Sequence, residues 1–333
     1  MSHDLCDKGG QENMMRVAVV GVGHFGKLHA AKYAAMEGVE LVAVVDQDQK
    51  RGGDVAALYG CRALTDYRKL AGEVDAASLT VPTVLHHEVG RDLLEMDIHL
   101  LVEKPITESV DSANTLIATA HARGLTLQVG HLERFSPAYF ALTERVSKPL
   151  FIEANRIAPC NPRTKDDNFV LDLMIHDIDL ITALVGAPLI SVDAVGAAVV
   201  SEGEDIVSAR LGFASGCAAN LTASRVSLKT ERSMRIFQPD TYLVADLAQR
   251  KVTVRRKGEG EMFPGIPNIE TEEFSFDEAD ALAQEIAAFV KCVRTREIPA
   301  VNGEAGRDAV QAALMITDSL LAHRRLLEQS GAI

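Results

Sequence analysis

The sequence predicts an N-terminal α/β domain built on a doubly wound parallel sheet, followed by a C-terminal α+β domain with a large, mostly antiparallel, open-faced sheet. Three observations lead to this fold class. Short aliphatic runs alternate with amphipathic stretches as far as about Pro149, a glycine-rich turn follows the first run, and closely spaced β-branched runs begin after Pro149. The 333 residues are enough for two domains, each with its own core.

The first domain is expected over residues 16–149, after a disordered leader at residues 1–15. Its aliphatic runs are typical of strands buried on both faces, at residues 16–20, 40–45, 76–81, 98–102 and 125–129. Stretches of helical length and period separate them, at residues 24–36, 48–58, 84–96 and 108–122. This alternation of strand and helix predicts a parallel sheet with right-handed crossovers.

The second domain is expected over residues 150–333. A strong helical segment at about 169–185 precedes strand-like runs, at residues 189–199, 205–213, 217–226, 232–238, 241–246 and 251–256. Segments rich in Gly, Asp and Ser separate these runs, which indicates a mostly antiparallel sheet. Helices are expected at about 279–295 and 303–328, at the end of the chain, where they could pack back on the first domain.

Composition and charge exclude several classes of function. The chain has 34 Lys and Arg against 47 Asp and Glu, a net charge of −13, which repels nucleic acid and anionic membranes. No apolar run approaches the roughly 18 residues of a membrane-spanning helix, and the N-terminus lacks the features of a signal peptide. We therefore expect a cytoplasmic protein with no nucleic-acid or membrane partner. The five cysteines stand far apart, which favours reduced thiols.

A glycine-rich turn, GVGHFG, directly follows the first predicted strand and precedes a predicted helix. Gly21 permits the tight turn, Gly23 lets backbone N–H groups approach a pyrophosphate, and Gly26 allows close packing of helix against strand. The pattern is typical of a Rossmann dinucleotide-binding domain, although glycine-rich turns also occur for purely structural reasons.

Asp46 ends the second predicted strand, 20 residues after Gly26. An acid at this place accepts hydrogen bonds from the adenosine ribose and repels a 2′-phosphate, so the cofactor is predicted to be NAD rather than NADP. Lys50 and Arg51 follow and could tolerate the phosphate. The structural alternative is that Asp46 caps the next helix.

A charged pair, Glu103 and Lys104, ends a buried strand in the sequence LVEKP. Open α/β sheets bind ligands at the carboxyl ends of their strands, so a functional role is favoured over a structural one. At this point the sequence resembles the Gfo/Idh/MocA family of NAD(P)-dependent sugar oxidoreductases. The matching segments follow the family's order over nearly the whole chain: GVGHFG, Asp46, VPTVLH (81–86), VEKP (102–105), VGHLERFSP (129–137), LDLMIHDID (171–179) and VNGEAGRDAV (301–310).

The resemblance implies roles for individual residues. The residues that would surround the pyrophosphate are Gly21, Gly23, His24, Phe25 and Gly26, and Asp46 would hold the adenosine ribose. The segment that passes close to the cofactor is matched by Pro82, Thr83 and His86. Nearer the nicotinamide, the matches are Glu103 beside its ribose, the active-site lysine Lys104, and Arg134.

Two positions depart from the family's pattern. His131 stands where the family usually has the asparagine of GxNxRF, and Met174 stands where it tends to have the glycine of DxGxHxxD. We expect the first change to alter the floor of the site and the second to narrow access beside the histidine.

The segment LDLMIHDIDL, residues 171–180, places one histidine and three aspartates in an apolar run. On a helix, Asp172, His176 and Asp179 share one face, because they are spaced i, i+4 and i+7. A carboxylate one turn from an imidazole can raise its pKa toward the working range of a general base. A satisfied core histidine and a metal site are the alternatives. The resemblance favours proton transfer, and no metal is predicted.

The predicted reaction moves a hydride between nicotinamide and a secondary hydroxyl of a sugar or sugar derivative. His176 is the candidate base, Lys104 would hydrogen-bond the reacting oxygen, and Asp172 would bind a neighbouring hydroxyl or orient the lysine. These three residues would contact the substrate. Further candidate substrate contacts, suited to a diphosphate, are the basic residues Arg156, Arg163 and Arg225, whose alternative is a solvated surface.

The combination of GHLERF with DLMIHDID is similar to the branch of UDP-N-acetylglucosamine 3-dehydrogenases, so C3 of a UDP-linked amino sugar is the expected point of attack. A free-sugar or inositol dehydrogenase is the alternative within the same reaction class. A non-catalytic NAD- or sugar-binding regulator is the alternative of another class, and the presence of both Lys104 and His176 argues against it. The open sheet face predicts a homodimer or homotetramer formed through the C-terminal sheet.

Overall fold

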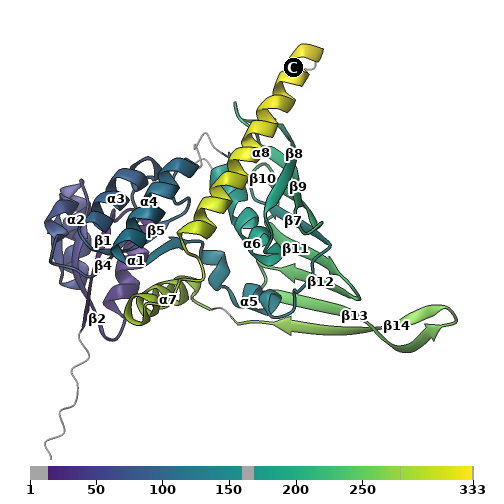
Figure 1. Ribbon diagram of the computed structural model, residues 1–333, viewed down its shortest axis with the longest axis horizontal. Helices are drawn as coiled ribbons and strands as arrows, with labels where there is room; N and C mark the ends of the chain where they lie inside the picture. Colours follow the sequence, from purple (N-terminus) through teal and green to yellow (C-terminus); the bar gives the residue numbers. More distant parts are fainter. Residues whose placement is uncertain (1–13, 160–168, 278, 332–333) are drawn as a thin grey trace, which may run out of the picture.

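The computed structural model describes residues 14–159, 169–277 and 279–331. Two sheets lie beside each other, each covered by helices, while a long hairpin and the end of the C-terminal helix project from the body (Figure 1). The predicted leader at residues 1–15 lies almost wholly outside the described residues, although Met15 already belongs to the first strand. No helix in the described ranges is long and apolar enough to cross a membrane.

The first sheet is the predicted doubly wound sheet. Its six parallel strands lie in the order β3-β2-β1-β4-β5-β6. They are β1 (Met15–Val20), β2 (Val39–Val45), β3 (Arg62–Leu64), β4 (Ala76–Leu79), β5 (His99–Glu103) and β6 (Leu127–Gly130). The strand order reverses between β1 and β4. In sheets of this kind a ligand-binding crevice forms at such a point, at the carboxyl ends of the strands. The sequence missed β3, which is too short to show a period.

Helices connect these strands and cover both faces of the sheet. They are α1 (His24–Ala34), α2 (Gln49–Tyr59), α3 (His86–Glu95) and α4 (Val110–Arg123), with short 3₁₀ turns η1 (Tyr67–Leu70) and η2 (Thr83–Leu85). Asp48 caps α2, because its carboxylate accepts a hydrogen bond of 3.0 Å from the backbone N–H of Arg51. Asp46 is therefore free of the capping role that was its structural alternative.

The second sheet has eight strands in the order β14-β13-β12-β11-β7-β10-β9-β8, and only the β7–β10 pair is parallel. The strands are β7 (Phe151–Ile157), β8 (Leu189–Ala197), β9 (Ile206–Phe213), β10 (Ala218–Ser224), β11 (Glu231–Gln238), β12 (Thr241–Asp246), β13 (Lys251–Phe263) and β14 (Ile266–Ser275). The mostly antiparallel sheet is confirmed. The sequence missed β7, where charged residues interrupt the alternation, and β14, whose side chains are nearly all exposed.

The C-terminal helices connect the two sheets. A π-helical turn, η4 (Val170–Met174), runs into α6 (Ile175–Val185), and α8 (Gly303–Ser330) packs on α6 and β8 and also on α4. Gly306 lets α8 approach the first sheet closely, because a Cβ there would lie 2.6 Å from Val129. The remaining helix, α7 (Ala281–Thr295), packs against α1, and its Phe289 shares a buried cluster with Val17 of β1. We propose the division into two domains near residue 150, with α7 returning to the first.

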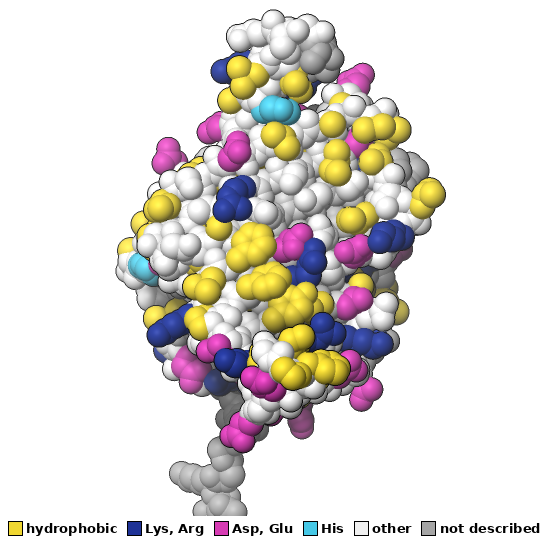
Figure 2. All heavy atoms as spheres, turned by 90° about the vertical axis from the view of Figure 1, so that its right-hand side faces the viewer, with side chains coloured by type: hydrophobic (Ala, Val, Ile, Leu, Met, Phe, Trp, Pro, Cys, Tyr) yellow, Lys and Arg dark blue, Asp and Glu magenta, His cyan; other side chains and the backbone are white. Residues whose placement is uncertain are grey.

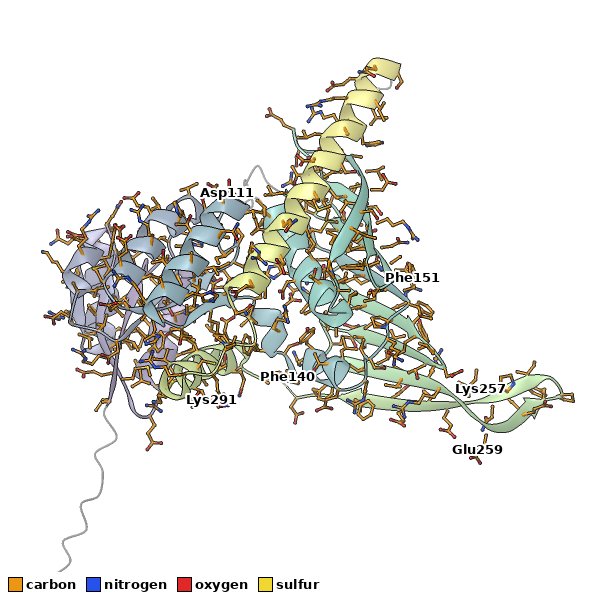
Figure 3. All side chains as sticks on the ribbon, in the orientation of Figure 1. Asp111, Phe140, Phe151, Lys257, Glu259 and Lys291 are labelled. Carbon is orange, nitrogen blue, oxygen red and sulfur yellow. The ribbon has the colours of Figure 1, made fainter. Side chains whose placement is uncertain are left out.

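One face of the eight-stranded sheet has no helix on it. Phe151 points outward from this face (Figure 3), and hydrophobic side chains gather near its centre among charged ones (Figure 2). Phe237 packs against Phe151 with ring centroids 5.8 Å apart and stacks on Tyr242 at 4.6 Å. Beyond this aromatic patch, β13 and β14 extend as an exposed hairpin marked by Lys257 and Glu259 (Figure 3).

Candidate active site

The turn between β1 and α1 requires glycine at two positions for different reasons. Gly21 has a φ of +87°, in the left-handed region, and a Cβ there would lie 2.9 Å from the backbone nitrogen of Val81. A Cβ on Gly26 would lie 1.9 Å from the carbonyl oxygen of Gly21, so helix and turn could not approach as they do. Open space surrounds Gly23. The turn thus forms a cradle at the positive end of α1 that fits a pyrophosphate.

Asp46 lies at the end of β2 and is almost completely buried. Its carboxylate accepts hydrogen bonds from the backbone N–H groups of Val22 at 3.0 Å and Asp48 at 2.9 Å, and from Arg51 at 2.6 and 2.8 Å. Burial opposes ionisation, but the bonds to Arg51 and to the two backbone groups hold the pKa of Asp46 below its ordinary value. The acid is therefore ionised and shielded by a cation.

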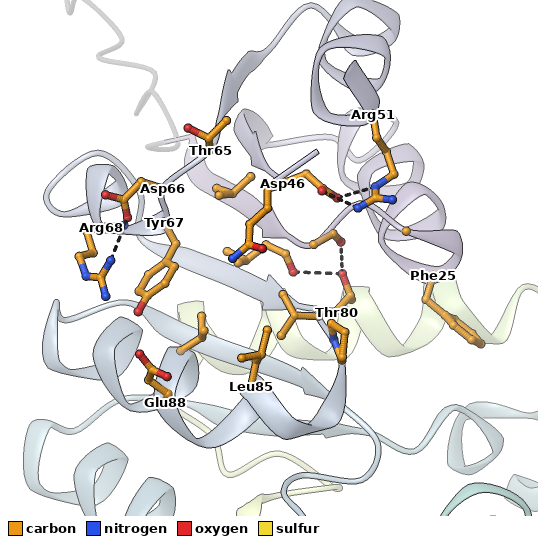
Figure 4. Close-up of a pocket in the computed structure, with 18 of the residues that line it drawn as sticks. Phe25, Asp46, Arg51, Thr65, Asp66, Tyr67, Arg68, Thr80, Leu85 and Glu88 are labelled. Atoms are coloured by element: carbon orange, nitrogen blue, oxygen red, sulfur yellow. Dashed lines mark hydrogen bonds and ion pairs between the residues drawn. The ribbon is translucent and has the colours of Figure 1, made fainter. Parts of the chain in front are cut away.

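A cavity of about 770 Å³ lies between this turn and the loops after β3 and β4. Phe25, Asp46 and Arg51 line one side, and Tyr67 and Leu85 line the other (Figure 4). The predicted residues on its wall are Gly21, Gly23, His24, Phe25, Asp46 and Pro82. The volume is in the range of small-molecule and cofactor sites.

The structure corrects the prediction for His86. This residue is buried, and its ring nitrogens lie 2.9 Å from the carbonyl oxygens of Pro105 and Val81. Burial lowers the pKa of His86. The imidazole thus bridges the backbone after β5 to the backbone after β4. It holds the loop that carries Thr83 and cannot offer a ring nitrogen to a ligand in the cavity.

Glu103 and Lys104 lie side by side at the carboxyl end of β5. The Glu103 carboxylate lies 3.1 Å from His29 Nε2 and accepts a hydrogen bond of 3.2 Å from the Lys104 backbone. The Lys104 ammonium donates to the carboxylate of Asp172 at 3.0 Å and to its carbonyl oxygen at 2.9 Å. The structure therefore brings together the predicted lysine and aspartate, which are 68 residues apart.

Asp172 lies on the π-turn and His176 lies in the first turn of α6. The Asp172 carboxylate binds Lys104, and the buried Nδ1 of His176 has no hydrogen-bond partner among the described residues. Burial and the charges of Lys104 and Arg156 hold the pKa of His176 well below 6.5. The predicted rise of this pKa is wrong, and the imidazole is neutral at pH 7.

Two sets of buried ion pairs surround His176. They link α6 to η3 (Leu132–Phe135), the turn after β6 that precedes α5 (Pro137–Thr143). Arg134 donates to Asp179 at 2.7 and 2.9 Å. Arg156 donates to Asp177 at 2.6 and 3.0 Å and to Glu133 at 2.7 and 2.8 Å. These charge-assisted bonds cross-link three segments, β7, η3 and α6.

This arrangement corrects one predicted contact. Arg156 is 2% exposed and lies between two carboxylates, which leaves it no open face for the substrate contact that was predicted. Arg134 binds Asp179 through Nε and one terminal nitrogen, and its place near the nicotinamide stays a prediction. Glu133 and Asp177, the partners of Arg156, were missed by the sequence analysis. Their signal was present, because each is an acid next to a predicted site residue inside an otherwise apolar segment.

The two departures from the family's pattern lie on the inner side of the site. Met174 has no exposed surface and belongs to the hydrophobic core, so its bulk is accommodated by packing and does not narrow an opening as predicted. His131 is also buried, 3.8 Å from the Asp179 carboxylate, and neither ring nitrogen has a hydrogen-bond partner among the described residues. Burial lowers the pKa of His131, which is therefore a neutral group in this wall.

The remaining basic candidates are Arg163 and Arg225. Arg163 lies outside the described residues. Arg225 follows β10, where its guanidinium donates to Asp205 at 3.2 Å and lies 5.4 Å from the ring centre of Phe169. Since Phe169 directly precedes the π-turn, Arg225 lies near the start of the segment that carries Asp172.

The fold and this site together define a class of protein. A glycine cradle, an acid at the end of β2, and a lysine beside a neutral histidine at the carboxyl edge of a doubly wound sheet define an oxidoreductase that binds a dinucleotide.

Comparison with known proteins gives the family. Residues 15–131 match the family model described as oxidoreductase family, NAD-binding Rossmann fold. Residues 155–240 match the Gfo/Idh/MocA C-terminal domain. The UDP-N-acetylglucosamine 3-dehydrogenase of Acidithiobacillus ferrooxidans is 39% identical over 303 residues, 91% of this chain and 96% of that protein.

The likeness extends to the solved structure of that dehydrogenase. It superposes with a TM-score of 0.87 at 38% identity, over 93% of this chain and 98% of that one. The scyllo-inositol 2-dehydrogenase (NAD(+)) of Bacillus subtilis is 28% identical, over 87% of this chain and 90% of that protein. The chain belongs to the Gfo/Idh/MocA family. The predictions of its fold class, of a dehydrogenase acting on CH–OH groups and of NAD as cofactor are confirmed.

The Asp46–Arg51 pair predicts how the cofactor preference changes. Asp46→Asn keeps an oxygen for a backbone N–H but removes the charge that holds Arg51 and repels a 2′-phosphate. We expect NADH affinity to fall about tenfold and NADPH affinity to rise, as measured by fluorescence titration with each nucleotide. Arg51→Ala in the Asp46→Asn background should abolish the gain for NADPH. An unchanged ratio of the two affinities in Asp46→Asn would contradict this prediction.

The environment of His176 predicts its titration. In protein carrying ¹³C-labelled histidine, with the His176 signal assigned by its loss in His176→Asn, NMR should give a midpoint below 6.5. Lys104→Met removes a nearby positive charge, so the midpoint should rise. Lys50→Met, which removes an exposed lysine elsewhere, is the matched control and should leave it unchanged. A wild-type midpoint at or above the ordinary value would show that the imidazole is not held neutral.

Proposed function

We propose that the enzyme oxidises the C3 hydroxyl of a UDP-linked amino sugar with NAD, and that UDP-N-acetylglucosamine is the substrate. One observation carries the proposal. Lys104 is fixed by Asp172 beside a neutral His176, in a chain 39% identical over 91% of its length to a UDP-N-acetylglucosamine 3-dehydrogenase. This arrangement supplies a base and a cation for the oxidation of a secondary alcohol.

The cofactor-binding residues are assigned from the cradle and the cavity. The turn at Gly21, Gly23 and Gly26 would hold the pyrophosphate together with the neighbouring His24 and Phe25, and Asp46 would hold the adenosine ribose. Pro82 and Thr83 would pass along the cofactor, and Glu103 would lie beside the nicotinamide ribose. When bound, NAD supplies the acceptor for the hydride.

Lys104 has the donors that the reacting oxygen needs. An ammonium group has three N–H donors, and two of them have partners in the described part of the chain, both on Asp172. The third would donate to the substrate oxygen and stabilise the negative charge that develops as the proton leaves. Asp172 would thus orient the Lys104 ammonium, which is one of the two roles predicted for this aspartate.

His176 would receive the hydroxyl proton. Its Nδ1 is buried, so we assign proton transfer to Nε2. The same burial and positive charge that keep the imidazole neutral make it ready to act as a base without prior deprotonation. The nearby Lys104 ammonium lowers the basicity of the imidazole, but it also stabilises the alkoxide from which the hydride leaves, so the second effect offsets the first.

Arg225 is the proposed contact for the diphosphate of a nucleotide sugar. Among the described residues, the guanidinium donates only through Nε, to Asp205, which leaves the terminal nitrogens for a bidentate contact. Its stacking on Phe169 directs the group toward the π-turn.

The proposal is tested by NADH formation with UDP-N-acetylglucosamine, free N-acetylglucosamine, glucose and scyllo-inositol. Turnover is expected with the nucleotide sugar. Lys104→Ala and His176→Ala should each lower kcat by about 10²-fold with nearly unchanged NADH binding. Turnover of scyllo-inositol alone would favour an inositol dehydrogenase, and no turnover with any compound would favour a binding protein. Full activity of His176→Ala would reject the assigned base.

We also propose that the protein forms a homodimer or homotetramer through the open face of the eight-stranded sheet. Phe237 in the aromatic patch is 38% exposed, and a patch of this kind on a sheet face is typical of an interface. Light scattering after size exclusion should show a smaller assembly for Phe237→Glu. The matched control is Leu58→Glu, which changes an exposed leucine on α2. A monomeric wild-type protein would refute the proposal.

A further inference from the structure

A chain of buried polar groups lies behind Glu103, on the side away from the cavity. The Tyr33 hydroxyl lies 2.9 Å from Ser78 Oγ, which lies 3.0 Å from His29 Nδ1. His29 Nε2 in turn lies 3.1 Å from the Glu103 carboxylate. The distances fit one direction of donation, from Tyr33 to Ser78, from Ser78 to His29 and from His29 to Glu103. Glu103 is therefore fixed from within the core.

Glu285 of α7 faces this chain but takes no part in it. The side chain has no exposed surface, and neither carboxylate oxygen has a hydrogen-bond partner in the part of the chain that the structure describes. Ligand atoms of Glu285, His29 and Glu103 all lie within 4.8 Å of one another. An unpaired, ionised carboxylate in such a place costs several kcal/mol in principle, whereas a protonated one does not.

In residues 14–159, 169–277 and 279–331, no side chain that faces Glu285 is an unpaired cation. The titratable side chains that face it are His29 and Tyr33 from α1 and Glu103 from β5. The charged residues of η3, which also packs on α7, are bound to other partners in the ion pairs around His176. Lys32 pairs with Asp280 at the exposed start of α7. Burial and the negative charge of Glu103 raise the pKa of Glu285 well above its ordinary value.

We propose that Glu285 is a neutral carboxylic acid that positions Glu103, so that the pair carries a single negative charge at the inner wall of the active site. Carboxylate oxygens of Glu285 and Glu103 lie within 4.8 Å of each other. One bridging water, or a rotation of the Glu285 side chain, would complete a hydrogen bond from the Glu285 O–H group to Glu103. Glu103 is confined on a third side, because a Cβ at Gly130 would lie 3.1 Å from its carboxylate. Ionisation of Glu285 would push Glu103 toward the cofactor and the adjacent Lys104.

The charge state is tested by stability. A raised pKa in the folded state means that Glu285 contributes stability below pH 4.5, the ordinary value, and loses it as pH rises. Glu285→Gln removes this loss. The unfolding temperature of the variant minus that of the wild type should therefore increase as the pH is raised from about 5 to about 8. Glu144→Gln, at an exposed glutamate, is the matched control and should show a constant difference. A constant difference for Glu285→Gln would overturn the proposal.

The positioning role is tested by NADH affinity against pH, a readout that rests on the proposed place of Glu103 beside the cofactor. The affinity of the wild type for NADH should weaken at alkaline pH, and Glu285→Gln should abolish this dependence on pH. Glu285→Leu should weaken the affinity for NADH about tenfold at every pH. Equal profiles for wild type and Glu285→Gln would reject positioning. This outcome is independent of which sugar the enzyme oxidises.

Two measurements on the unaltered protein keep the inference testable if the variants fail to fold. Infrared spectroscopy at about pH 8 should show the band of a protonated carboxyl group, and its absence would overturn the proposal. Elemental analysis of the purified protein should show no stoichiometric divalent cation. A bound cation would also overturn the proposal, since the three side chains would then be ionised or neutral ligands of that ion.

Discussion

The site depends on the buried ion pairs that join η3 to the catalytic helix. Arg156 reaches across from β7 to Glu133 and Asp177, and Arg134 binds Asp179. The two aspartates follow His176 within three residues, so they hold the proposed base in a fixed position relative to the end of the first sheet. Removal of one partner from such a pair typically costs about 3–5 kcal/mol, because the other charge stays buried alone. Geometry between the two sheets is therefore fixed by charge as well as by packing.

Burial then sets different charge states on neighbouring groups. Lys104 donates two hydrogen bonds to Asp172, while His176 is held neutral by burial and by that same ammonium. Catalytic acids and bases are commonly separated in this way by their surroundings. Glu103 and Glu285 repeat the pattern behind the site: Glu103 has hydrogen-bond partners, and the Glu285 carboxylate has none in the described part of the chain. The same low polarity that makes the core stable thus determines which groups can exchange protons.

The sequence predicted those features that depend on local patterns. Aliphatic runs separated by amphipathic stretches gave the first sheet, and the spacing of Gly21 and Gly26 gave a turn that tolerates no other residue at either position. Lys104 was found because it follows a buried strand. The π-turn was missed, since one extra residue in a helical repeat leaves no mark in an apolar run. The ion pairs between segments far apart in the sequence, such as those of Arg156, could not be predicted from local patterns either.

The two departures from the family's pattern indicate where substrate choice is made. Met174 packs in the core and His131 is buried beside Asp179, so both change the layer behind the base, and neither adds a surface that a sugar could touch. Burial lowers the pKa of His131, so the imidazole adds no charge to this layer. We therefore propose that selection between a nucleotide sugar and a free polyol comes from the other side of the π-turn, where Arg225 lies over the ring of Phe169.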